Sequence, residues 1–81
     1  MDLNEALQSC RRGSLIRDEG GTMKPGWRIK FVKHFGKEGK FVYINPKGED
    51  AHRIIFNDAH RASWQWHTVS SEYPTEKDMP K

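Results

Sequence analysis

The chain has 81 residues, of which 35% are hydrophobic and 31% are charged, so it holds one domain with a thin core. Because a small domain gains burial by pairing, we expect it to form a homo-oligomer. Its single cysteine, Cys10, excludes an intramolecular disulfide. The lack of a signal-peptide pattern and of a run of about 18 apolar residues predicts a cytoplasmic protein without a membrane span. The net charge of +3 favours an anionic partner, such as a nucleotide, a nucleic acid or an acidic protein.

The first element in the chain is predicted to be a capped helix. Asp2 and Glu5 have the spacing of a capping box, in which each side chain accepts from a backbone N–H near the other residue. One buried helix face is indicated by the spacing of Leu3, Ala6, Leu7 and Cys10. Gly13 is typical of the left-handed residue that ends a helix.

Five short strands follow, each indicated by alternation of apolar and polar residues. The predicted strands are Ser14 to Asp18, Trp27 to Phe35, Lys40 to Asn45, His52 to Phe56 and Trp64 to Val69. Gly36 to Gly39 and Asn45 to Gly48 are predicted turns, and a short helical turn precedes the last strand. Because the connections are short, we expect an α+β domain over residues 1–69, with the helix packed on an antiparallel sheet. Residues 70–81 are expected to form a disordered tail.

Basic side chains are scattered along the chain, and three of them fall on neighbouring predicted strands. Arg28 and Lys30 share one strand face, and Arg17 lies on the preceding strand. They could gather around an anion, since arginine suits bidentate contact with phosphate. The alternative is a solvated strand face.

The tryptophans are either core residues or a stacking platform for a base. Trp64 and Trp66 are two residues apart, so in the predicted strand both point to one face. We expect Trp27 or Trp64 to stack on a nucleobase. Asp58 would accept from a ribose hydroxyl or merely cap the helical turn.

The sequence lacks the spacing of a catalytic or metal site. His34, His52, His60 and His67 do not have zinc-ligand spacing. Cys10 lies on the apolar helix face, where a thiol behaves as a small hydrophobe. Ser63 and His60 lie three residues apart with no acidic residue placed to orient them. We therefore expect no enzymatic activity, no metal and no cofactor.

Both ends of the predicted domain resemble the Thoeris anti-defence 2 family. The opening Leu3-Asn4-Glu5-Ala6-Leu7, followed by Gly13 and Arg17, is similar to the helix and arginine-bearing strand of that family. Asp58, followed six residues later by Trp64, is similar to its closing segment, in which an aspartate starts a helical turn. The resemblance extends from about residue 3 to residue 69, with motifs at the two ends only.

The sequence departs from the family at three places. Ser63 stands where the family has a second aspartate, Arg61-Ala62 replaces a Leu-Ala step, and Gly26-Trp27 arrives later than the Gly-Trp of the family. The resemblance implies a phage protein that sequesters cyclic ADP-ribose-type or related nucleotide signals of bacterial immunity without cleaving them. It also implies oligomers with ligand sites between subunits.

These observations lead to the hypothesis of a non-catalytic module that binds an anionic nucleotide. Phosphates would pair with Arg17, Arg28 and Lys30, a base would stack on Trp27 or Trp64, and Asp58 would contact a ribose. Two alternatives remain: a small basic nucleic-acid-binding protein, and a protein–protein inhibitor of a host defence enzyme.

Overall fold

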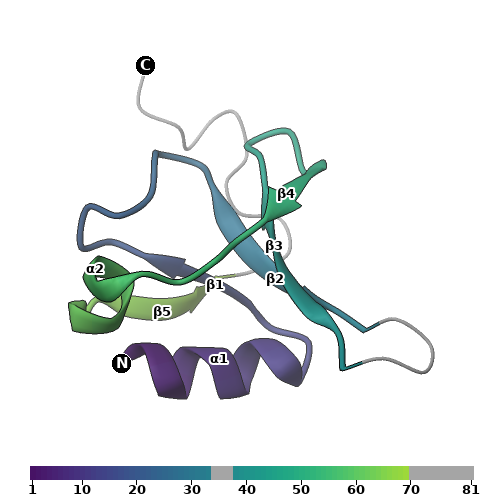
Figure 1. Cartoon of the computed structure of the whole chain (residues 1–81). Coiled ribbons are helices and arrows are strands. Elements are labelled where there is room, and N and C mark those ends of the chain that lie inside the picture. The colour runs from purple at the N-terminus through teal and green to yellow at the C-terminus, as the bar shows by residue number, and fades with distance from the viewer. Residues whose placement is uncertain (34–37, 70–81) are drawn as a thin grey trace.

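The computed structural model of the protein describes residues 1–33 and 38–69. The protein consists of an antiparallel sheet with one helix lying across part of one face (Figure 1). The strand order is β4-β3-β2-β1-β5. The elements are α1 (Leu3–Arg11), β1 (Leu15–Asp18), β2 (Arg28–Val32), β3 (Lys40–Ile44), β4 (Asp50–Arg53), α2 (Asp58–Ala62) and β5 (Trp66–Val69). The predicted α+β fold, with a short helix before the last strand, is confirmed.

Helix α1 begins at the cap that the sequence predicts. The carboxylate of Asp2 accepts from the backbone N–H of Glu5 at 2.9 Å. Gly13 follows the helix with a φ of 109°, a left-handed conformation that residues with a Cβ rarely adopt. The helix packs on β1, β2 and β5, and its buried thiol, Cys10, has a pKa raised to about 12 by burial. Cys10 is therefore a packing residue.

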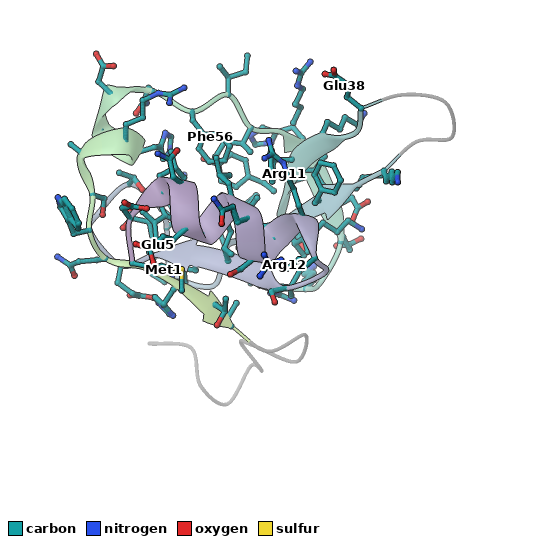
Figure 2. All side chains as sticks on the ribbon, turned by 90° about the horizontal axis from the view of Figure 1, so that it is seen from below. Met1, Glu5, Arg11, Arg12, Glu38 and Phe56 are labelled. Carbon is teal, nitrogen blue, oxygen red and sulfur yellow. The ribbon has the colours of Figure 1, made fainter. Side chains whose placement is uncertain are left out.

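The core lies between α1 and the sheet. Ile16 pairs with Ile29 across β1 and β2, so both side chains point to the helix, and neither is exposed to solvent. Trp66 of β5 is 1% exposed and donates its Nε1–H to the carbonyl of His60 at 2.9 Å. In the view from below, Phe56 reaches from the connection between β4 and α2 towards α1 (Figure 2). Its ring contacts that of Trp66 edge-on, with centroids 6.1 Å apart.

Strands β1 and β2 begin one residue later than predicted, and two further strands begin two residues away from their predicted starts. Strand β4 covers Asp50–Arg53 rather than His52 to Phe56. Ile54 follows the strand, donates its backbone N–H to the carbonyl of Phe41 at 3.1 Å, and places its side chain in the core at 5% exposure. Strand β5 begins at Trp66 rather than Trp64.

The expectation that Trp64 and Trp66 share one strand face is wrong, since Trp64 precedes the strand and is 75% exposed. The hydroxyl of Ser63 binds the carboxylate of Asp18, and the backbone of Trp66 pairs with that of Met1. Gln65, directly before the strand, also accepts from the backbone N–H of Glu19 at 3.1 Å, so the segment before β5 is tied to the end of β1. The end of the predicted second strand and the first half of the Gly36 to Gly39 turn lie outside the described residues, as does the predicted tail, residues 70–81.

Candidate functional site

Three aromatic rings surround an open cleft at the end of the sheet that α1 does not cover. The cleft has a volume of about 260 Å³ and is lined by Thr22, Met23, Lys24, Trp27, Tyr43 and His52. The rings of Trp27 and Tyr43 meet edge-on at 5.9 Å and 85°. The His52 ring lies 4.9 Å from that of Tyr43 and 6.3 Å from that of Trp27. We call this site the aromatic cleft.

The register of β2, β3 and β4 brings these rings together. Tyr43 pairs with Ile29, so its side chain lies on the core side of the sheet. Between Val42 and Ile44 the register with β4 shifts, and an extra residue of β4 is accommodated there. His52 thereby faces Tyr43. Burial raises the pKa of the Tyr43 phenol, which stays protonated at neutral pH.

Arg17 holds the loop that forms one wall of the aromatic cleft. Its side chain is buried, and its Nη1–H donates to the carbonyls of Lys24 at 2.9 Å and Trp27 at 2.6 Å. Its Nε pairs with the carboxylate of Glu19. The guanidinium thus joins the sheet to both ends of the Lys24–Trp27 wall.

Asp18, the next residue, anchors the other end of this loop. Its carboxylate is 1% exposed and accepts from the backbone N–H of Gly20 at 2.8 Å and from the hydroxyls of Thr22 and Ser63. Burial opposes ionisation, but the hydrogen bonds from Ser63, Thr22 and Gly20 outweigh it, so the pKa of Asp18 lies below its ordinary value. The loop that lines the cleft is therefore tied to a buried carboxylate.

His60 and Ser63 do not form a nucleophile and base pair. The Nδ1 atom of His60 accepts from the backbone N–H of Asn57 at 3.0 Å, and Nε2 is buried without a hydrogen-bond partner among the described residues. Ser63 donates to Asp18 instead. Burial lowers the pKa of His60, although the charge of Asp18 partly opposes this shift, so the imidazole is neutral at pH 7.

The predicted cationic residues all have protein contacts. Arg17 is buried as described, and Nη1 of buried Arg28 lies 3.3 Å from the carbonyls of Gly26 and Asn45. The Lys30 ammonium lies 2.6 Å from the Asp50 carboxylate. The structure does not bring the three around one anion, and direct roles for them in ligand binding remain predictions.

The predicted aromatic and acidic residues are dispersed over the molecule. Trp27 lines the aromatic cleft, whereas Trp64 lines a separate hollow of about 160 Å³ together with Arg61. Asp58 is exposed in the first turn of α2, and the helix cap is Asn57 rather than Asp58. The structure therefore places Trp27 and Trp64 in different hollows.

Sequence reasoning missed the rest of the aromatic cleft. Tyr43 and His52 lie nine residues apart in sequence and meet only through the shifted β3–β4 register. Asp18 carried a usable signal, because an aspartate before Gly20 and Gly21 favours a turn in which its side chain binds the backbone.

Comparison with known protein families, with curated proteins and with solved structures found no match to this chain. In the two described ranges, no group of three histidine, cysteine, aspartate or glutamate side chains is arranged to hold a metal ion. Within the same ranges, no helix has the length and apolar character needed to cross a membrane.

Proposed function

We propose that the protein is a non-catalytic binding module whose aromatic cleft takes the heterocyclic ring of an anionic nucleotide ligand. The observation that carries this proposal is the convergence of Trp27, Tyr43 and His52 on one open space. Stacking of a base on an aromatic side chain contributes about 1–3 kcal/mol, and a neighbouring edge-on ring limits how that base is oriented.

The charges around the aromatic cleft favour an anion over a cation. Lys24 lines the cleft, and the six described residues that line it include neither aspartate nor glutamate. An aromatic cage binds a cationic group because the cation is attracted to the ring faces. The positive charge of Lys24 would repel such a group. The volume of about 260 Å³ is slightly below the roughly 300–1,000 Å³ usual for drug-sized ligands. We infer that one base fits inside, while sugar and phosphate groups extend past Lys24.

A role in counter-defence is part of the same proposal. The resemblance of residues 3–17 and 58–64 to the Thoeris anti-defence 2 family supports a protein that sequesters a nucleotide immune signal. A protein that sequesters a signal must retain its ligand without reacting with it. Ser63 and His60 are the residues considered above as a nucleophile and base, and they are hydrogen-bonded to Asp18 and Asn57 instead.

Native mass spectrometry tests the proposal on the intact chain. Protein purified from cells that produce cyclic ADP-ribose-type signals should carry an added mass of nucleotide size, which protein from cells without these signals lacks. The bound compound should be released intact on denaturation. A clean protein mass in both preparations would reject these signals as ligands.

Matched variants then test the aromatic cleft. Trp27→Leu and Tyr43→Leu should each weaken binding of the captured nucleotide about tenfold or more, in line with the stacking contribution. Trp64→Leu is the control, because Trp64 lies in another hollow. Equal affinity of all three variants and the wild type would reject the aromatic cleft as the binding site.

A protein–protein inhibitor is the second candidate, favoured by the exposure of Trp64. Its side chain is 75% exposed beside Arg61, and tryptophan and arginine are enriched among the residues that dominate interface energies. This function predicts a stable complex with a host enzyme that Trp64→Ala abolishes and nucleotide does not affect.

A further inference from the structure

The face of the sheet opposite the aromatic cleft carries a second hollow. It has a volume of about 240 Å³ and lies over β2, β3 and β4, with Val32 and Val42 among its lining residues. Lys40 and Arg53 also line it. Since Val42 lies next to Tyr43 on β3, the two side chains point to opposite faces, and this hollow is separated from the aromatic cleft by the sheet.

Strand register gathers three cationic side chains around Val42. Lys30 pairs with Val42 on one side and Arg53 pairs with it on the other, so the three form a row across β2, β3 and β4. Lys40 lies two residues from Val42 on the same face of β3. Directly opposed residues have Cβ atoms about 4.5–5.5 Å apart and diagonal ones about 7–8 Å, so side chains of this length can reach one group. We call Lys30, Lys40 and Arg53 the basic cluster.

The basic cluster has more positive than negative charge. Among the described residues that line the hollow, Asp50 is the one carboxylate, and it pairs with Lys30 at 2.6 Å. Lys40 and Arg53 are exposed and make no ion pair with any residue of the described ranges. Two cations beside an apolar floor are therefore available to an anion.

We propose that the basic cluster is a second binding site, which takes a phosphate or polyphosphate group. Arg53 suits bidentate contact with phosphate oxygens, and Lys40 supplies a point charge beside it. This site goes beyond the proposed function, because it lies on the other face of the sheet and does not require a base in the aromatic cleft. His52 of edge strand β4 lines both hollows, so a ligand that crosses this edge could contact both.

Titration with inorganic tripolyphosphate at low ionic strength tests the basic cluster directly. The wild type should bind, and Arg53→Gln and Lys40→Gln should each weaken binding about tenfold, as expected for a charge-assisted hydrogen bond. Lys47→Gln is the control, because it removes the same charge from an exposed lysine in a turn outside the hollow. No binding by the wild type, or an equal loss in Lys47→Gln, would overturn the proposal in favour of diffuse attraction.

Removal of a negative charge, instead of a positive one, gives a second test. Asp50→Asn frees Lys30 and should tighten tripolyphosphate binding severalfold, whereas Glu49→Gln, on the neighbouring residue outside the hollow, should change it less. Equal effects of both variants would contradict a local site. Because all the altered residues are on the surface, thermal unfolding should confirm that each variant is folded.

Further measurements distinguish the basic cluster from the aromatic cleft, and a nucleotide from a free phosphate as the ligand of the basic cluster. Trp27→Leu should leave tripolyphosphate affinity unchanged, and a loss in that variant would place the anion in the aromatic cleft and overturn the proposal. If Arg53→Gln also weakens ATP but not adenosine, the basic cluster takes the phosphates of a nucleotide. If only tripolyphosphate is affected, the site serves free phosphates. Failure of the aromatic cleft would instead appear as unchanged nucleotide binding in Trp27→Leu.

Discussion

The two ends of the sheet differ in what covers them. At the β1 and β5 end, α1 packs over the strands, and Leu3, Ala6, Ile16 and Trp66 are all 3% exposed or less. At the other end, all four residues of edge strand β4 are exposed. A cation–π contact marks the boundary, where the Arg11 guanidinium of α1 lies 5.5 Å from the centre of the Phe41 ring.

This difference separates stability from recognition. The covered end buries the apolar surface that a small domain needs to fold. The uncovered end carries the aromatic cleft on one face and the basic cluster on the other. Arg17 and Asp18 connect the two ends, since they lie on β1 and their side chains hold the loop that lines the aromatic cleft. The following predictions test this division.

Trp66→Ala should have the largest effect, because it empties the core under α1. We expect a loss of about 3–5 kcal/mol in the free energy of unfolding, measured by urea denaturation. Because this loss could unfold the chain outright, Trp66→Phe provides a milder version that should remain folded. Trp27→Leu, at the uncovered end, should be much less destabilising. Similar losses in Trp27→Leu and Trp66→Ala would contradict the division.

Asp18→Ala should affect both ends. It leaves the Ser63 and Thr22 hydroxyls and the Gly20 N–H without their acceptor, and we expect a loss of about 1–3 kcal/mol in unfolding free energy. Nucleotide affinity should fall as well, because Thr22 lines the aromatic cleft. The control Asp58→Ala removes an exposed carboxylate and should destabilise by less than about 1 kcal/mol. Unchanged affinity in Asp18→Ala would show that this carboxylate does not position the loop.

Stability should decrease in mild acid because of His60. Burial lowers its folded-state pKa below the value of about 6.5 expected in the unfolded chain, although Asp18 partly opposes the shift. The unfolded state therefore takes up the proton first. The contribution of His60 is complete above pH 6.5 and is lost as the pH falls through 6.5 towards the folded pKa, by at most about 1.4 kcal/mol per pH unit.

Urea denaturation between pH 7.5 and 5 measures this slope. His60→Gln keeps a side-chain acceptor for the Asn57 N–H and should flatten the slope, whereas His67→Gln, at a more exposed histidine, should retain it. A slope in His60→Gln as steep as in the wild type would assign the pH dependence to another group.

Trp64→Ala should have the smallest effect. Exposed side chains outside special structural features change stability by about 0.5 kcal/mol or less, and Trp64 is 75% exposed. Thermal unfolding at several protein concentrations checks this expectation. A larger loss that depends on protein concentration would indicate that Trp64 is buried between copies of the chain.

The sequence alone determined the elements that depend on near neighbours. The Asp2 cap, the apolar face of α1 and the Gly13 terminator lie within thirteen residues, and the structure contains all three. The pairing of β2 with β3 places Ile29 beside Tyr43 and so agrees with the predicted alternation. Such features follow from local hydrogen bonding and from residue periodicity, which are readable along the chain.

Tertiary structure alone decided which side chains are buried and which are available to a ligand. Trp64 and Trp66 have the same residue type, but the Trp66 ring packs against the ring of Phe56, whereas the Trp64 side chain is 75% exposed. Arg17 was expected to bind phosphate, yet its donors are directed at the Lys24 and Trp27 carbonyls. Burial depends on contacts between distant segments, such as Asp18 with Ser63 across 45 residues, and the spacing of residues along the chain does not contain that information.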